Sequence, residues 1–214
     1  LTQGLTMPQF RIGTDDFKKL RDENGYFVDK SLLIKEIIEG SDVTLLPRPR
    51  RFGKTLNMTM LRYFFEKTET NNAYLFEGLE IAQYPEYMKH QGQYPVIYLS
   101  LKDFKRASFE SFLHAVQIEI SRLFQTFSHI QSILDNGRKK RFLRICREEG
   151  DIDDYYSSMK ELILYCYQYY QKPVIVIIDE YDASMIEART NGYYDKISQF
   201  MRFWLGGGLK HDNA

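Results

Sequence analysis

Two groups of residues in the sequence have types and spacing that suit chemistry on phosphates. The first is Gly53-Lys54-Thr55, the end of the phosphate-loop pattern Gly-x-x-x-x-Gly-Lys-Ser/Thr, although Arg48 stands where the first glycine belongs. The second is the acidic pair Asp179-Glu180, which directly follows the apolar run 174–178. The first group suits the binding of an anion, and the second suits the binding of a metal ion with a water molecule. Phosphoryl transfer to water uses both, so each motif predicts the other.

The chemistry expected of the two groups is complementary. Backbone N–H groups at Gly53 and the start of a following helix form an anion hole, and Lys54 adds a full positive charge on the β- and γ-phosphates of ATP. The Thr55 hydroxyl would ligate Mg²⁺, and Asp179 would hold the water shell of the same ion. Glu180 would orient and deprotonate the attacking water. Taken alone, Asp179-Glu180 is equally well explained as the solvated end of a strand.

The residues around the glycine extend the predicted nucleotide site. Arg48, Arg50 and Arg51 could supply the positive charge that an arginine finger normally gives, or they could form a solvated basic loop. Arg51 is favoured because it lies closest to Gly53. Asp182 suits either a further magnesium or water partner or a helix N-cap. The predicted catalytic residues are Lys54, Glu180 and Arg51; the predicted nucleotide-binding residues are Arg50, Arg51, Phe52, Gly53, Lys54, Thr55 and Leu56; the predicted metal ligands are Thr55 and Asp179.

Strands and helices alternate in the predicted secondary structure, which is typical of an α/β fold with a mostly parallel sheet. An apolar strand at 43–46 stops at Pro47-Arg48-Pro49, and a helix with an apolar stripe follows the glycine. Asp29 or Ser31 is expected to cap an early helix, and Gly40 to end it in the left-handed conformation. Asp153 is expected to cap a later one. Strands are predicted at 43–46, 96–101 and 174–178, and helices at 15–21, 33–38, 54–67, 108–127, 138–149, 153–171 and 193–205, the last weakened after 205 by Gly206-Gly207-Gly208.

Composition excludes several classes of protein. The chain has 214 residues, 43% of them hydrophobic, and only two cysteines, so a disulfide-stapled scaffold is excluded. The apolar run 174–178 is far shorter than the roughly 20 residues of a membrane-spanning helix, which predicts a cytoplasmic protein without membrane contact. Equal numbers of basic and acidic residues, 29 each, remove any bulk attraction to nucleic acid. The 15% aromatic content favours helices with bulky inner faces. Neither His114 nor His129 has partners at metal-ligand spacing.

The sequence resembles the AAA-ATPase-like family of P-loop proteins. Members commonly carry Arg-Pro-Arg-Arg-Phe-Gly-Lys-Thr in the loop and Ile-Ile-Asp-Glu-Tyr-Asp at the acidic motif, as this chain does at 48–55 and 177–182. The resemblance also includes Asp16-Phe17 and the segments 26–30 and 191–195, so it covers most of the chain. It implies that an arginine at position 48 is normal and that Asp29-Lys30 lies near the nucleotide.

The resemblance also implies a domain plan. It predicts a three-layer P-loop sandwich over 43–214, preceded by a leader at 1–13 and a helical segment at 14–42 that packs on the nucleotide domain. Family members usually continue into a sensor strand, a lid and often a nuclease domain. No such strand is readable after Asp182, so we expect the C-terminal strands to be lacking. A homo-oligomer, a nuclease domain and nucleic acid are partners by family analogy only.

The function expected from these residues is magnesium-dependent binding and hydrolysis of ATP. Two alternatives remain open at this stage. One is a nucleotide-binding switch without appreciable hydrolysis, which acts through a missing C-terminal domain or a partner. The other is a nucleotide-independent scaffold, in which the arginines fold into the phosphate site and neutralise Asp179.

Overall fold

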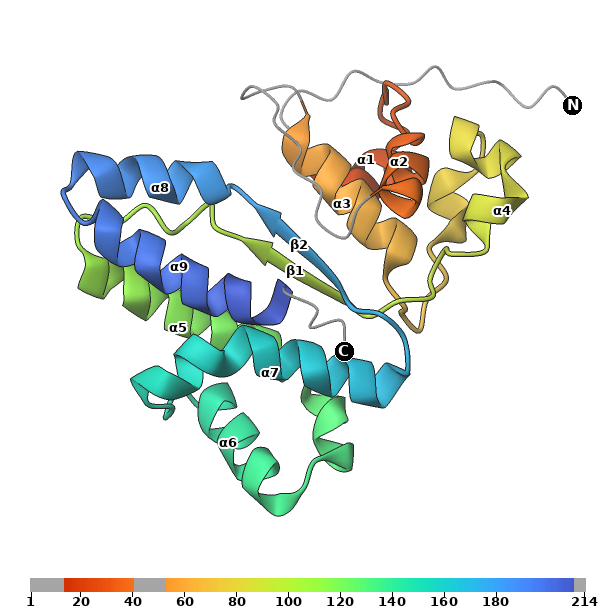
Figure 1. Cartoon of the computed structure of the whole chain (residues 1–214). Coiled ribbons are helices and arrows are strands. Elements are labelled where there is room, and N and C mark those ends of the chain that lie inside the picture. The colour runs from red at the N-terminus through yellow and green to blue at the C-terminus, as the bar shows by residue number, and fades with distance from the viewer. Residues whose placement is uncertain (1–13, 41–52, 210–214) are drawn as a thin grey trace, which may run out of the picture. The chain divides into compact units, whose positions relative to one another are not determined.

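The computed structural model in Figure 1 describes residues 14–40 and 53–209, and the side chains among them up to residue 206. The chain forms two compact units, residues 1–96 (unit 1) and 97–214 (unit 2). The predicted strand at 43–46 and the predicted site residues Arg48, Arg50, Arg51 and Phe52 lie outside the described residues.

Unit 1 is built from short helices around a cluster of phenylalanines. The Phe17 ring lies 5.3 Å from the Phe76 ring, which in turn lies 5.1 Å from the Phe64 ring. The backbone N–H of Phe17 donates to Thr59 Oγ1 at 3.0 Å, which fixes the start of the first helix against the third. The helices of unit 1 are α1 (Phe17–Asp22), α2 (Leu33–Glu39), α3 (Lys54–Phe65) and α4 (Pro85–Met88), with 3-10 turns η1 (Ala73–Phe76) and η2 (Glu80–Gln83).

The capping predicted for α2 is wrong. Its N-cap residue is Leu32, without a side-chain hydrogen bond, and Gly40 at its end is extended with φ −80°. Asp29 instead accepts the backbone N–H groups of Ser31 at 2.8 Å and Glu80 at 2.7 Å. The Ser31 hydroxyl accepts the N–H of Ile81 at 3.1 Å. Both side chains therefore bind a turn about fifty residues away along the chain, and these bonds replace the cap.

Unit 2 is a mixed helical and strand unit with a two-stranded parallel sheet among the described residues (Figure 1). Three helices connect its two strands, as a parallel pair requires a crossover. This arrangement is compatible with the predicted α/β class. The strands are β1 (Val96–Ser100) and β2 (Ile175–Asp179), and the helices are α5 (Phe109–Thr126), α6 (Asn136–Cys146), α7 (Ile152–Tyr170), α8 (Tyr181–Thr190) and α9 (Tyr194–Leu209), with the 3-10 turn η3 (Ser128–Ile133).

Helix α9 continues beyond the end predicted for it. It runs through Gly206 and the two following glycines to Leu209, although each interior glycine costs roughly 1 kcal/mol relative to alanine. The inner face of the helix explains this result, because Phe200 and Trp204 are completely buried with their rings 5.4 Å apart. Tertiary packing therefore outweighs local propensity here. No helix in the described part of the chain is both long and apolar enough to cross a membrane.

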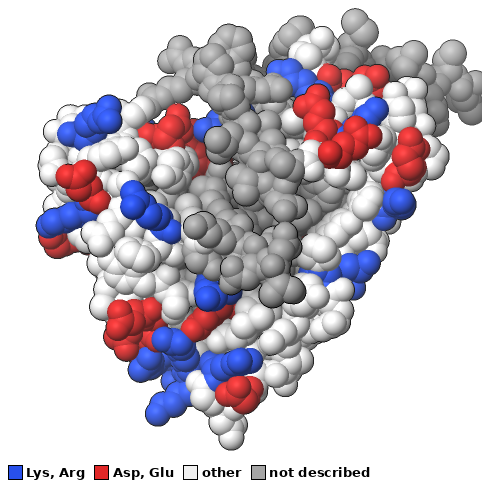
Figure 2. Space-filling model, in the orientation of Figure 1, with Lys and Arg blue, Asp and Glu red and all other residues white. Residues whose placement is uncertain are grey.

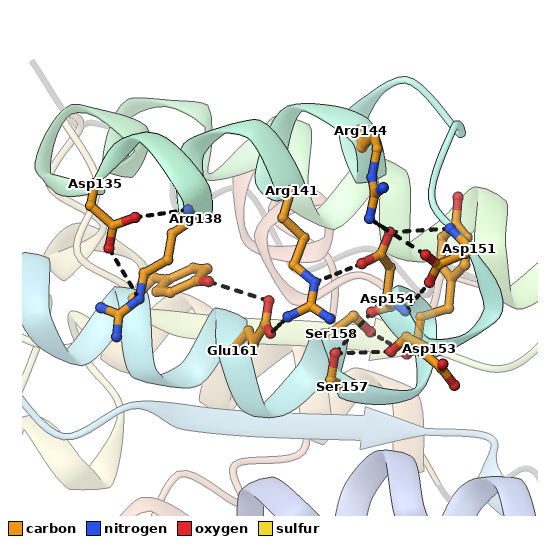
Figure 3. A network of polar contacts seen from close by, with 12 residues as sticks. Asp135, Arg138, Arg141, Arg144, Asp151, Asp153, Asp154, Ser157, Ser158 and Glu161 are labelled. Carbon is orange, nitrogen blue, oxygen red and sulfur yellow. Dashed lines mark hydrogen bonds and ion pairs between the residues drawn. The ribbon is translucent and has the colours of Figure 1, made fainter.

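Arginine side chains of α6 form ion pairs with acidic side chains of α7 (Figure 3). Asp154 is completely buried, and it accepts Arg141 Nε at 2.6 Å and an N–H of Arg144. Arg141 also donates to Glu161. Asp151, not the predicted Asp153, is the N-cap of α7, and its side chain accepts the N–H of Asp154 at 2.9 Å. Part of the positive charge of α6 is therefore used to hold two helices together.

Candidate functional site

Gly53 and the first turn of α3 carry the predicted site residues of unit 1. Gly53 is the N-cap residue in the left-handed conformation, with φ 71°, and its carbonyl accepts the N–H of Asn57 at 3.0 Å. The first N–H groups of an α-helix have no acceptor within the helix, so they can donate to another partner. Lys54, Thr55 and Leu56 occupy this first turn and are partly exposed. The predicted helix after the glycine is confirmed, and its N-terminus can receive an anion.

Asn57 is a polar residue on the buried stripe of α3. It is 2% exposed and shares this face with Met60, Leu61 and Phe64. Its Nδ2 has no hydrogen-bond partner among the described residues. Most buried polar groups are paired, so an unpaired amide next to the first turn is unusual. Sequence reasoning missed Asn57, although an asparagine on an otherwise apolar helical stripe was a readable signal.

Asp179 lies at the carboxyl end of β2, in unit 2. The residue is completely buried. Its Oδ1 accepts the N–H of Glu180 at 2.9 Å, and its Oδ2 has no partner among the described residues. A buried carboxylate is costly unless it is paired or bound to a metal ion. Hard cations such as Mg²⁺ prefer carboxylate oxygens, so the unpaired Oδ2 fits a magnesium ligand, directly or through bound water.

Glu180 adopts an unusual backbone conformation between β2 and α8. Its φ is 60°, in the left-handed region that few residues other than glycine adopt, and it is the N-cap of α8 without a side-chain cap bond. Such strain costs roughly 1–3 kcal/mol and tends to occur at functional sites. Asp182 lies within the first turn of α8, so the N-cap role considered for it is wrong. Partial burial raises the pKa of the neighbouring Tyr181 phenol.

The backbone of Leu101 joins the two flanks of this turn. Its N–H donates to the carbonyl of Asp179 at 2.9 Å, and its carbonyl accepts the hydroxyl of Ser184 at 3.2 Å. The carbonyl also accepts the N–H of Phe104 at 3.1 Å. Leu101 and Ser184 are both completely buried. The turn that carries Glu180 is therefore held on the strand side and on the helix side. Ser184 gave no signal in the sequence.

The predicted site residues divide between the two units. Gly53, Lys54, Thr55 and Leu56 belong to unit 1, whereas Asp179 and Glu180 belong to unit 2. Each of the two groups lies at a turn with a left-handed residue at the N-cap of a helix. No three His, Cys, Asp or Glu side chains gather as a metal site in the described ranges 14–40 and 53–206. A magnesium site needs few protein ligands because the ion retains several waters.

Surface charge is mixed on the face shown in Figure 2. Lysine and arginine side chains alternate with aspartate and glutamate side chains over the described part of this face. The pattern agrees with the formal net charge of zero. Any specific binding of an anion must therefore depend on a local site and not on the field of the whole chain.

Comparison with known proteins gives a family but no fold neighbour. The sequence model of the family described as "Predicted AAA-ATPase" matches residues 11–214. A protein of Azotobacter chroococcum mcd 1, described as "Uncharacterized protein in vnfD 5'region", is 35% identical over 78 residues. That match covers 36% of this chain but only 14% of the relative. No solved structure matches the chain. Because the family match spans nearly the whole sequence, the chain belongs to the predicted AAA-ATPase family.

Proposed function

We propose that the chain binds ATP with magnesium and transfers the γ-phosphoryl group to water. One observation carries the proposal: Asp179 is completely buried, yet its Oδ2 has no partner among the described residues. An isolated buried carboxylate costs several kcal/mol, by order of magnitude, unless a cation or a donor compensates it. Magnesium supplied with ATP would provide that compensation. Membership of a predicted AAA-ATPase family supports nucleotide binding in general.

Each of the two groups of residues has its own role in the proposal. The N–H groups of the first turn of α3 and the Lys54 ammonium bind the β- and γ-phosphates, and the Thr55 hydroxyl contributes a metal ligand. Asp179 orients the water shell of the metal, and Glu180 accepts the proton of the attacking water. Bound magnesium would neutralise charge on the phosphate oxygens.

The proposal extends to the architecture. We infer a P-loop sandwich over residues 43–214, with 14–42 packed on it, and with Arg50, Arg51 and Phe52 as further contacts to the nucleotide. The parallel pairing of β1 and β2 supports this inference, because ligands of open α/β sheets bind at the carboxyl ends of the strands. Asp179 is the last residue of β2, at that end of the strand.

Calorimetric titration of ATP, with and without magnesium, tests the proposal together with phosphate release from the same samples. Lys54→Ala is expected to abolish detectable binding, whereas Lys139→Ala, which removes an exposed lysine of α6, is expected to bind as the wild type does. Glu180→Gln is expected to keep binding and to lose about 100-fold or more in turnover, since general base catalysis typically contributes that much.

The outcomes separate the competing functions. Binding without turnover in the wild type would support a nucleotide-binding switch. A folded wild-type chain that binds no ATP at millimolar concentration, with or without magnesium, would contradict the proposal.

A further inference from the structure

We infer that Ser184 is a positioning residue, which holds the Asp179–Glu180 turn in its observed conformation through the backbone of Leu101. The catalytic consequence of this role rests on the proposed function. The positioning itself rests on hydrogen bonds between described, buried groups of unit 2.

The Ser184 hydroxyl has an unusual partner for a serine inside a helix. A serine inside a helix commonly donates to the carbonyl four residues earlier in the same helix, which here is Glu180. Ser184 instead donates to Leu101, on the loop that follows β1, at 3.2 Å. The Glu180 carbonyl accepts the N–H of Ala183 at 3.2 Å. The hydroxyl therefore connects α8 to another element and does not cap its own turn.

Leu101 is bonded on both sides of Glu180 along the chain. The N–H of Leu101 donates to Asp179, immediately before Glu180, and its carbonyl is bonded to Ser184, one helical turn after Glu180. One peptide backbone thus holds both flanks of a single strained residue. If the helix-side bond is removed, Leu101 holds only the strand side of the turn, and Glu180 can relax more easily from its φ of 60°.

Loss of the Ser184 hydroxyl leaves no buried acceptor unpaired. The Leu101 carbonyl keeps a donor without Ser184, because the N–H of Phe104 also reaches it at 3.1 Å. Alanine is smaller than serine and creates no clash. Ser184→Ala should therefore fold, and its effect should be confined to the turn.

Amide hydrogen exchange in the nucleotide-free chain tests the positioning directly. Losing one hydrogen bond of ordinary strength should accelerate exchange at Glu180 and Ala183 by about fivefold in Ser184→Ala. Ser184→Cys, which replaces the hydroxyl by a thiol that is a much weaker donor, is expected to behave in the same way. Ser121→Ala is the matched control, because Ser121 is equally buried and donates to the carbonyl of Ile145 at 2.7 Å. It should leave exchange in the turn unchanged.

Turnover adds the readout that a merely structural role would not change. Ser184→Ala should lower kcat about tenfold or more while the Kd for ATP with magnesium stays the same, because small displacements of catalytic groups are costly. Ser121→Ala should keep the wild-type kcat. Equal exchange in Ser184→Ala and Ser121→Ala would overturn the inference, and so would faster exchange with an undiminished kcat. If the wild type does not hydrolyse ATP, the proposed function fails, and the exchange data alone decide the role of Ser184.

Discussion

The indole N–H of Trp204 in α9 donates to the hydroxyl of Ser158 in α7 at 3.0 Å, and both side chains are almost completely buried. The Ser158 hydroxyl donates in turn to the carbonyl of Tyr155 at 2.7 Å. This bond joins the two long helices at the centre of the unit 2 core. Since Trp204 is the only tryptophan in the chain, its fluorescence reports on unit 2.

Removing the Ser158 hydroxyl should destabilise unit 2. Ser158→Ala leaves the buried Trp204 N–H without an acceptor, which should lower the free energy of unfolding by about 1–3 kcal/mol. Urea unfolding followed by tryptophan fluorescence measures the loss. Ser157→Ala, at the adjacent and more exposed serine of α7, should change stability by no more than about 0.5 kcal/mol. Equal effects of the two substitutions would contradict the importance of the indole bond.

The buried carboxylate of Asp154 should be a larger stability determinant. Asp154→Asn leaves Arg141 and Arg144 without their shared anion, and breaking a buried pair costs about 3 kcal/mol or more. Both guanidinium groups are partly exposed, about 40%, so we expect the low end of that range. Denaturant midpoints measured by circular dichroism test this expectation.

Asp135→Asn is the matched control for Asp154→Asn. Asp135 pairs with Arg138 at 3.5 Å on the surface and caps α6 through the N–H of the same residue. Asparagine caps helices as well as aspartate does, and exposed ion pairs contribute little. Its cost should therefore stay below about 1 kcal/mol. A loss as large as that of Asp154→Asn would show that burial of the network is irrelevant.

Alkaline pH should destabilise the chain through Cys166. Burial raises the pKa of this thiol to about 12, whereas an unfolded cysteine titrates near 8.5. The folded chain therefore holds the proton more tightly, so the stabilisation is complete below about pH 8.5 and is lost as pH rises toward 12. The slope attributable to this group reaches about 1.4 kcal/mol per pH unit. Unfolding free energies of the wild type and Cys166→Ala between pH 8 and 10 should converge as pH rises; parallel curves would refute the effect.

Neutralising Asp179 should impair the proposed magnesium binding without lowering the free energy of unfolding. Asp179→Asn removes the charge of a buried carboxylate whose Oδ2 is unpaired among the described residues, so the nucleotide-free chain should be as stable as the wild type or more stable by about 1 kcal/mol. The same variant should lose the magnesium dependence of ATP binding. Thermal unfolding with and without ATP and magnesium measures both. A variant that is strongly destabilised without ligand would mean that the carboxylate has a structural role.

Elements with strong local periodicity were predictable from sequence, and contacts between distant segments were not. The stripe of α3 and the apolar strand β2 lie within about two residues of their predicted bounds. The cap of α2 failed because Asp29 and Ser31 bind η2, which no local pattern reveals. The end of α9 failed because burial of Trp204 outweighs the glycines.

The candidate site was predictable only where it follows a motif. The turn at Gly53 and the position of Asp179 at the end of a strand were both expected, since the two motifs specify them. Tertiary packing decides which groups surround a buried polar side chain. It therefore determines both the unpaired amide of Asn57 and the bond of Ser184 to Leu101. A single polar residue on an apolar face carries no signal for its partner. The left-handed conformation of Glu180 was equally invisible, because no glycine marks it.

The turn at Gly53 requires a residue that adopts the left-handed backbone conformation. The space available for a side chain is not what favours glycine there. A Cβ atom added to Gly53 would meet nothing within 4 Å among the described residues, although the residue has φ 71°. An L-alanine at this position would therefore be opposed by backbone strain alone, roughly 1–2 kcal/mol. A D-alanine introduced by chemical ligation has the mirror-image preference and should fit without strain. It should also stabilise the start of α3, because it restricts the unfolded chain more than glycine does.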